Sequence, residues 1–288
     1  MRVTLFGASG LLGQELVNAV KLRGLELNAL TSKDADLRDH PRVNRLIRDS
    51  QPDCIILSAA FTDVDGCESN RDLAMAVNCE GAVNVAKAAR ATGSRLMLLS
   101  TDYVFDGTKS SPYEIGDARN PINVYGESKA RAEEQLLHLV PDACIVRTSW
   151  LFGHGGNCFP ATILKLAATR PEISIVNDQR GSPTFTRDLA STLVQLCEKG
   201  AGGIVHATNS GNCTWYEFAT EIVRTSGLPA EVKPVTTAEF PRPARRPPYS
   251  VLSPASLDAY GIHMPKWQDA LGRYLRNDAP AAKSIPNL

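Results

Sequence analysis

The sequence predicts an α/β protein with a doubly wound parallel sheet and a smaller C-terminal region. Over the first 150 or so residues, short apolar runs alternate with segments of helical periodicity. The runs are apolar throughout, which is typical of parallel strands covered by helices on both faces. The chain has 288 residues, 43% hydrophobic and 22% charged, as in globular proteins, and this length indicates about two domains.

The predicted strands of the first region are the short apolar runs at residues 3–6, 27–30, 54–58, 95–100 and 144–148. Between them, apolar residues recur at helical spacing, as Leu12, Leu16 and Val20 do. These patterns predict helices over residues 11–22, 43–49, 73–92 and 128–139, with Pro52 and Gly93 following two of them. The first domain is therefore expected to span residues 1–150.

The second region, residues 151–275, is less regular. Strands near 173–176 and 204–207 are expected to extend the sheet of the first domain, each following a helix, at 161–168 and 189–198. A further helix is predicted over 215–226. Residues 241–248 are rich in proline and arginine and predict a loop, and residues 277–288 predict a flexible tail.

Composition excludes several classes of protein. Thirty-one basic residues balance 31 acidic ones, which argues against a nucleic-acid binder. The seven cysteines form no C-x-x-C pair, so we expect buried, reduced thiols. The histidines show no metal-ligand spacing, and we expect no metal site. We see no signal peptide and no apolar run of about 18 residues, so we expect a cytoplasmic protein without a membrane partner.

Three glycines mark a phosphate-binding turn. Gly7, Gly10 and Gly13 lie directly after the first predicted strand and at the start of the first predicted helix. They would allow a sharp turn, close approach of the backbone to a pyrophosphate, and close packing of helix on sheet. Free N–H groups at the helix N-terminus would then face the anion. A tight turn without a ligand is the alternative, but the strand–turn–helix context favours a Rossmann-like dinucleotide site.

The end of the second predicted strand bears on which dinucleotide binds. Dinucleotide sites commonly carry an acidic residue there for the adenosine ribose, whereas this chain has Ser32 and Lys33. A hydroxyl and an ammonium suit a 2′-phosphate, which favours NADPH, although NADH remains possible. Just beyond, Asp36 and Leu37 could frame the adenine, and Asp36 could equally cap the next helix.

A candidate catalytic group follows the fourth predicted strand. Tyr125 and Lys129 form Y-x-x-x-K, a spacing that places both side chains on one helix face. A nearby ammonium would lower the tyrosine pKa and make the phenol a usable general acid for a carbonyl oxygen. Ser100 and Thr101 end the fourth strand, where a hydroxyl could reach the same crevice. Together with the glycine turn, this arrangement predicts an oxidoreductase.

These elements resemble the extended short-chain dehydrogenase/reductase superfamily, and the longer motifs resemble its dTDP-4-dehydrorhamnose reductase family. The similar segments include S-T-D-Y-V-F-D-G at 100–107, P-I-N-V-Y-G-E-S-K at 121–129 and R-T-S-W at 147–150. N-D-Q at 177–179, G-S-P-T at 181–184 and P-A-R-R-P at 243–247 also match. The resemblance covers about residues 1–275. It implies NAD(P)H-dependent reduction of the 4-keto group of dTDP-4-dehydro-6-deoxy-L-mannose to dTDP-L-rhamnose, a precursor of cell-wall polysaccharide.

The resemblance also implies residue roles. Tyr125 would protonate the forming alkoxide, Lys129 would hold the nicotinamide ribose, and Thr101 would hydrogen-bond the keto oxygen. The remaining cofactor contacts that it implies are Gly10, Leu11, Leu12, Asp36, Leu37, Ala60, Phe61 and Thr62. The implied substrate contacts are Thr101, Asp102, Trp150 and, for the diphosphate, Arg245 and Arg246. Residues 151–275 would mostly form the substrate-binding region.

Two departures from the family pattern stand out. The acidic residue at the end of the second strand is missing, as noted above. Some family members pair through Mg²⁺ held by glutamates, and this chain keeps Glu15 but has Arg187 where another acidic ligand would align. A magnesium-bridged dimer is therefore doubtful, and the chain is expected to be a monomer or a homodimer.

Two other functions remain open at this stage. The regulatory β subunits of methionine adenosyltransferase share the S-x-D-Y-V-F-D-G signature, so that motif does not exclude a non-catalytic role. The intact Thr101, Tyr125 and Lys129 favour an enzyme. A reductase or epimerase for another nucleotide sugar is the second alternative, because the sequence fixes neither the base nor the sugar stereochemistry.

The residues at the end of the second strand generate a prediction about cofactor preference. Titration of the purified protein, followed by nicotinamide fluorescence, should show NADPH binding more tightly than NADH. The reason is that Ser32 and Lys33 can accommodate a 2′-phosphate, whereas no carboxylate stands ready for a free 2′-hydroxyl. Tighter binding of NADH would contradict this interpretation.

Overall fold

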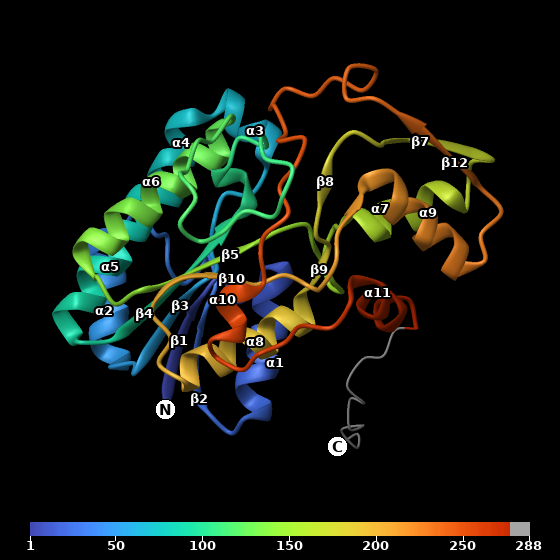
Figure 1. Cartoon of the computed structure of the whole chain (residues 1–288). Coiled ribbons are helices and arrows are strands. Elements are labelled where there is room, and N and C mark those ends of the chain that lie inside the picture. The colour runs from blue at the N-terminus through green and yellow to red at the C-terminus, as the bar shows by residue number, and fades with distance from the viewer. Residues whose placement is uncertain (277–288) are drawn as a thin grey trace.

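The computed structural model describes residues 1–276 and contains a central six-stranded parallel sheet (Figure 1). The strands lie in the order β10-β5-β4-β3-β1-β2. Their bounds are β1 (Arg2–Phe6), β2 (Glu26–Leu30), β3 (Cys54–Leu57), β4 (Arg95–Thr101), β5 (Cys144–Thr148) and β10 (Gly203–His206). The doubly wound parallel sheet predicted from the sequence is therefore confirmed.

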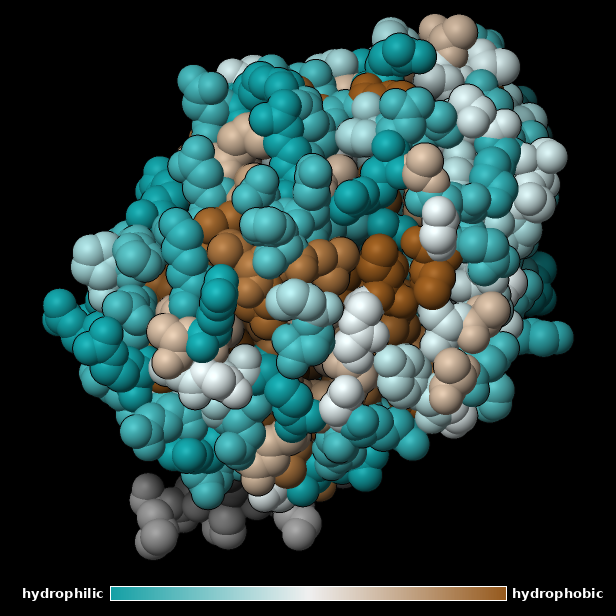
Figure 2. Space-filling model, turned by 60° about the vertical axis from the view of Figure 1, so that its left-hand side comes forward, coloured by the Kyte–Doolittle hydropathy of each residue, from teal (hydrophilic) through white to brown (hydrophobic). Residues whose placement is uncertain are grey.

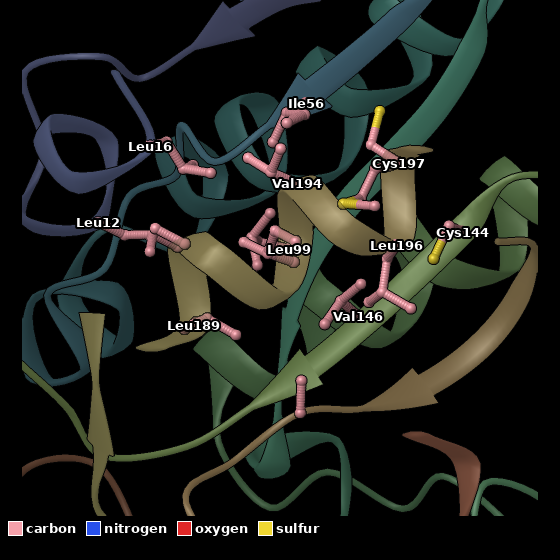
Figure 3. Packing of buried hydrophobic residues seen from close by; sticks show 14 of the residues in the cluster. Leu12, Leu16, Ile56, Leu99, Cys144, Val146, Leu189, Val194, Leu196 and Cys197 are labelled. Carbon is pink, nitrogen blue, oxygen red and sulfur yellow. The ribbon is translucent and has the colours of Figure 1, made fainter. Parts of the chain in front are cut away.

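Helices cover both faces of this sheet, as Figure 1 shows. One face carries α1 (Leu11–Leu22), α8 (Thr186–Glu198) and the short α10 (Ala255–Asp258). The other carries α2 (His40–Ser50), α5 (Gly81–Thr92) and α6 (Val124–Leu139). On the first face, leucine and valine side chains of α1 and α8 pack onto Ile56, Leu99 and Val146 of the strands (Figure 3). Burial on both faces explains why the central strands are continuously apolar.

The chain order places a crevice at the carboxyl ends of the strands. From β1 the chain passes to β2 on one side and then returns to β3 on the other. Helices of the two faces therefore diverge beside β1, and ligands of open α/β sheets bind at such a switch point. The glycine turn after β1 opens onto this crevice, and so do the ends of β3, β4 and β5.

The predicted helix over 73–92 is interrupted. The segment comprises the end of α4 (Arg71–Met75), a π-helical turn η1 (Ala76–Glu80) and α5, and a short helix α3 (Val64–Ser69) precedes it. The π-turn brings Asn78 to the segment that follows β3, where its amide pairs with the backbone N–H and C=O of Phe61 at 2.7 and 3.0 Å. The same amide donates to Ser128 of α6 at 3.0 Å. Such turns often occur at functional sites.

Residues after β5 form a second, smaller core beside the sheet. Short strand pairs join β6 (Leu151–Phe152) to β9 (Thr184–Phe185) and β8 (Arg180–Gly181) to β11 (Cys213–Thr214). They pack with α7 (Phe159–Ala167), α9 (Trp215–Ser226) and α11 (Trp267–Leu275). The core is aromatic, with Phe152, Phe185 and Phe218 wholly buried.

The placement of the strand at 173–176 differs from the prediction. We expected it to extend the main sheet, but β7 (Glu172–Val176) pairs only with β12 (Glu231–Val235), in a separate two-stranded sheet. The reason lies in its pattern, since Glu172 and Ser174 are exposed and Ile173 is buried. A strand with one exposed face does not suit a sheet covered on both faces. By contrast, β10 does lie beside β5 in the main sheet.

The expectation that all seven cysteines are free is wrong for one pair. Cys54 of β3 and Cys197 of α8 form a disulfide in the structure. They lie 143 positions apart in the sequence but meet in the core between sheet and helix. Sequence spacing cannot reveal such a pair, because packing of α8 on the sheet brings the two together. Five other cysteines are free: Cys67, Cys79, Cys144, Cys158 and Cys213.

The surface is largely hydrophilic. On the face shown in Figure 2, hydrophobic residues gather in a hollowed central band, and hydrophilic residues surround them. Within residues 1–276, no helix combines the length and the apolar character needed to cross a bilayer. The loop at 241–248 is ordered and docks onto α3 through ion pairs of Arg242 and Arg246 with Asp65. The tail predicted at 277–288 lies outside the described residues.

The packing of α1 against the glycine turn generates a stability prediction. A Cβ at Gly13 would collide with the backbone carbonyl of Gly7. We therefore expect Gly13→Ala to lower the free energy of unfolding by about 1–3 kcal/mol, as overpacking does, and to weaken NADPH binding. Gly116→Ala is the matched control, because no atom lies within 4 Å of its added Cβ. Equal urea midpoints for the two variants would contradict the argument.

Candidate active site

A cleft of about 850 Å³ opens at the carboxyl ends of β1, β3, β4 and β5. Most of the residues singled out from the sequence line it, although they come from distant parts of the chain. Those residues are Gly7, Gly10, Leu11, Leu12, Gly13, Ser32, Asp36, Leu37, Ala60, Thr62, Thr101, Asp102, Tyr125, Lys129 and Trp150.

Four singled-out residues do not line this cleft in the described part of the chain. Lys33 is exposed on the loop after β2. Phe61 packs instead, with Tyr125, against a small apolar cluster behind the cleft. Arg245 is exposed, and its carbonyl oxygen accepts from Asn123 at 2.8 Å. Arg246 is largely buried and pairs with Asp65 at 2.5 Å.

The turn after β1 forms a cradle made by backbone. Gly7 adopts a φ of +94°, and a Cβ there would lie 2.6 Å from the Ala59 nitrogen after β3. Gly10 is the N-cap of α1 and has no side chain to occupy the first turn of the helix. The first N–H groups of α1 are thus presented to the cleft, as a pyrophosphate requires. The residues present fit the phosphates of a dinucleotide.

The opposite end of this channel is polar. Asp34 accepts from the Thr31 backbone N–H and hydroxyl at 2.9 and 2.7 Å, which closes the turn after β2. Asp36 forms a two-pronged pair with Arg38, at 2.6–3.1 Å. Arg38 lines the cleft beside Ser32 and Asp36. The sequence analysis did not single it out, although it directly follows Asp36 and Leu37.

Thr101 and Tyr125 both line the cleft, and hydrogen bonding by the Thr101 hydroxyl acts to lower the pKa of Tyr125. Asn123 caps α6 by accepting from Gly126 at 2.7 Å, so the helix begins just before Tyr125. Gly126 lies so close to the Tyr103 carbonyl that a Cβ would collide with it. This close approach, which only glycine permits, brings Tyr125 against the end of β4. The Lys129 side chain follows one turn along the same face of α6.

The pKa shifts differ from the sequence-based expectation. We expected Lys129 to lower the pKa of Tyr125, but burial raises it above its ordinary value, and Asp102 raises it further when its carboxyl group is ionised. The phenol is therefore protonated at neutral pH, which is the form that a proton donor needs. Burial lowers the pKa of Lys129 to about 8, against the opposing effect of Glu133.

A buried ion pair anchors α6 beneath these side chains. Glu133, with no exposed side-chain surface, accepts from the Arg147 guanidinium at 2.7 and 3.0 Å. It also accepts from the Ser100 hydroxyl at 2.5 Å. Arg147 is 1% exposed and stacks over the Phe105 ring at 5.0 Å. These contacts fasten the helix to β4 and β5 directly below Thr101.

Trp150 is held by contacts that the sequence did not reveal. It has a φ of +48°, an uncommon conformation for a residue with a side chain, at the turn after β5. Its indole stacks on Trp215 with 3.5 Å between ring centroids, and a Cβ on Gly181 would lie 2.5 Å from its other side. Trp215 also lines the cleft. It starts α9 in the smaller core, so only the fold brings the two indoles together.

Comparison with known proteins agrees with this geometry. The model of the family described as "RmlD substrate binding domain" matches residues 1–279. The chain belongs to this family. It is 42% identical over 280 residues to the spore coat polysaccharide biosynthesis protein SpsK of Bacillus subtilis, covering 97% of this chain and 99% of that protein.

Other relatives of this RmlD family member carry reductase names. A dTDP-4-dehydrorhamnose reductase of Streptomyces griseus is 41% identical, covering 92% of this chain and 90% of that protein. A dTDP-4-keto-6-deoxy-D-glucose reductase of Streptomyces niveus is 40% identical, covering 85% and 86%. The crystal structure of the Bacillus anthracis dTDP-4-dehydrorhamnose reductase in complex with NADP is 38% identical, with a TM-score of 0.93, covering 96% of this chain and 99% of that one.

The position of Glu15 bears on metal binding in this RmlD family member. Its carboxylate lies 3.7 Å from the Arg187 guanidinium, so a cation of the protein already faces it. Within residues 1–276, no three His, Cys, Asp or Glu residues cluster as metal ligands would. These contacts do not fit a magnesium ion at Glu15.

The anchoring of α6 generates a prediction. Glu133→Gln leaves Arg147 buried without its counter-ion, so we expect it to lower the free energy of unfolding by about 3 kcal/mol or more. The neighbouring Glu134→Gln is the control, because Glu134 is exposed and should change stability by less than about 0.5 kcal/mol. Chemical denaturation measures both. A Glu133→Gln protein as stable as the control would show that the pair does not hold the helix.

Proposed function

We propose that this protein reduces the 4-keto group of dTDP-4-dehydro-6-deoxy-L-mannose with NADPH and forms dTDP-L-rhamnose. The observation that carries the proposal is the convergence of Thr101, Tyr125 and Lys129 in a cleft that also contains a backbone cradle for phosphates. The reductase relatives support the same reaction. The preserved catalytic group argues against a purely regulatory role.

Three residues of the chain have separate roles in the proposed reaction. Bound NADPH supplies a hydride for the carbonyl carbon at C4 of the sugar. Tyr125 donates its phenolic proton to the oxygen that becomes negative, and Thr101 donates a hydrogen bond to the same oxygen. Lys129 holds the nicotinamide ribose and stabilises the phenolate that Tyr125 becomes. The depth of burial of Lys129, 2% exposed, strengthens this effect.

The cofactor extends from this centre along the cleft. Gly10, Leu11 and Leu12 would hold its pyrophosphate, and Asp36 and Leu37 would hold its adenine. Gly7 and Gly13 would shape the turn around the phosphates, and Ser32, with Lys33 next to it on the same loop, would accommodate the 2′-phosphate. The segment of Ala60, Phe61 and Thr62 runs beneath the cofactor, held by Asn78.

The sugar nucleotide approaches from the smaller core. Asp102 and Trp150 contact the sugar nucleotide, the latter from its slot between Trp215 and Gly181. The exposed Arg245 is available to bind the diphosphate of the substrate. Arg246 would contact the diphosphate while it remains paired with Asp65. The protein works in the cytoplasm as a monomer or homodimer.

Reduction of another 4-keto dTDP sugar is the second candidate function. The Streptomyces niveus relative, named as a reductase of dTDP-4-keto-6-deoxy-D-glucose, favours this alternative. The two functions differ in the substrate's stereochemistry, so the sugar configuration of the product distinguishes them.

The experiment combines a product assay with a matched pair of variants. Purified protein should oxidise NADPH when dTDP-4-dehydro-6-deoxy-L-mannose is added, and NMR should identify dTDP-L-rhamnose. Tyr125→Phe should lower kcat by about 10²-fold or more yet bind NADPH normally, since only the donated proton is lost. Tyr260→Phe should keep full activity, because its hydroxyl bonds Gly202 elsewhere. No NADPH oxidation, or an active Tyr125→Phe variant, would contradict the proposal.

A further inference from the structure

Asp102 presents an unusual carboxyl group at the active site. It starts a 3-10 turn η2 (Asp102–Val104) directly after Thr101, lines the cleft, and is only 2% exposed. Its Oδ1 lies 3.0 Å from the Thr101 hydroxyl. Its Oδ2 is buried and has no hydrogen-bond partner among residues 1–276. A carboxylate in such a place would be costly, because a buried charge needs compensation.

Hydrogen bonds from the Ser250 and Thr101 hydroxyls and from the backbone N–H groups of Asp102 and Tyr103 favour the Asp102 carboxylate, but they offset only part of the effect of burial. Tyr103 follows it in η2, and Tyr125 faces it from α6; both are neutral phenols. The loop after Arg246 contributes the hydroxyl of Ser250. The Arg246 guanidinium is paired with the Asp65 carboxylate, and the Tyr103 phenol contributes to raising the pKa of Arg246. Lys129 lines the same cleft, and Glu133 is the main negative group acting on it.

The protonation state of Asp102 decides in which direction the single proton of the Thr101 hydroxyl can point. Its Oγ1 accepts from the Tyr103 backbone N–H at 3.1 Å, which leaves one acceptor position and one proton. If Asp102 is ionised, the proton points to Oδ1 and none is directed at Tyr125. If Asp102 is protonated, its O–H fills the remaining acceptor position, and the Thr101 proton is free to point at Tyr125.

We propose that Asp102 stores a proton and returns it through the Thr101 hydroxyl to Tyr125 after each turnover. This inference rests on the proposed reductase function, in which Tyr125 loses its proton to the substrate oxygen. It assigns Asp102 a chemical role in addition to contact with the sugar, for which the partnerless Oδ2 remains available.

The transfer is balanced at every atom. Once Tyr125 has given its proton to the sugar oxygen, that oxygen is a neutral hydroxyl, and the phenolate is the stronger acceptor. The Thr101 hydroxyl then turns from the product to Tyr125. The Thr101 O–H bond breaks as the Tyr125 O–H bond forms, and Oγ1 simultaneously takes the proton of Asp102. The Asp102 carboxylate regains a proton from water when the product leaves the cleft.

The acidities give this transfer a downhill direction. Burial raises the pKa of Asp102 to about 7, although hydrogen bonds from Ser250 and Thr101 partly oppose it. Asp102 is therefore substantially protonated near neutral pH. The pKa of Tyr125 is higher still, since burial raises it above its ordinary value. A proton consequently moves from Asp102 to the phenolate.

The Asp102→Asn variant tests the role of the stored proton, because it removes that proton and little else. The amide keeps the shape, a donor toward Thr101 and an acceptor for the sugar, but it has no acidic proton to give. The experiment is stopped-flow NADPH oxidation with dTDP-4-dehydro-6-deoxy-L-mannose. We expect a burst of about one turnover per site that is faster than the turnovers that follow it, because Tyr125 starts protonated. A steady state slowed by about tenfold or more should follow. A role limited to sugar binding or structure would slow the first and the later turnovers alike and would give no burst.

The wild type supplies an independent measurement if Asp102→Asn fails to fold or to bind NADPH. Its steady-state rate should fall as pH rises through about 7, while its first-turnover rate stays constant. Thr101→Ser, which keeps the hydroxyl, should retain this behaviour. Equal pH profiles for the two rates, or an Asp102→Asn variant with no burst or with wild-type steady state, would overturn the relay alone. A wild type that reduces no 4-keto dTDP sugar would overturn the proposed function as well.

Discussion

The buried ion pair between Glu133 and Arg147 is the constraint on which the active site depends. Glu133 lies four positions after Lys129 and eight after Tyr125, so the three share one face of α6. Arg147 lies beside Ser100 in the register of β5 and β4, and Ser100 itself bonds Glu133. Fixing Glu133 therefore fixes the distance and rotation of the catalytic face relative to the end of β4, where Thr101 and Asp102 lie. Burial makes the pair intolerant of losing one partner, which secures this geometry.

In the proposed function, the two parts of the protein would hold phosphate groups in different ways. The cofactor side uses backbone N–H groups at the start of α1, which require glycine rather than cations. On the substrate side, the loop at 241–248 carries arginines, but Asp65 neutralises Arg242 and Arg246 and fixes the loop on α3. Tyr103, next to Asp102, contributes to raising the pKa of Arg246. The loop thus closes the site from outside, while the ion pair supports it from within.

Sequence patterns predicted what is local and periodic. The bounds of α1, β5 and α9 match the predictions, because amphipathic periodicity and buried apolar runs define them. Patterns failed where tertiary packing decides. The stacking of Trp215 on Trp150, the role of Asn78 in a π-turn and the pairing of Cys54 with Cys197 join distant segments. The alternation in β7 was visible in the sequence and should have excluded it from the main sheet. The raised pKa of Tyr125 depends on burial, which spacing alone does not report.

The most direct test of the account is a crystal structure of the protein with NADP and dTDP-L-rhamnose. The account predicts that the C4 hydroxyl of the sugar lies within hydrogen-bond distance of the Tyr125 and Thr101 hydroxyls, with the pyrophosphate of the cofactor on the N-terminus of α1. It also predicts an Asp102 carboxyl group still in contact with Thr101. A sugar whose C4 hydroxyl lies away from Tyr125, or a cofactor bound elsewhere than at the glycine turn, would contradict it.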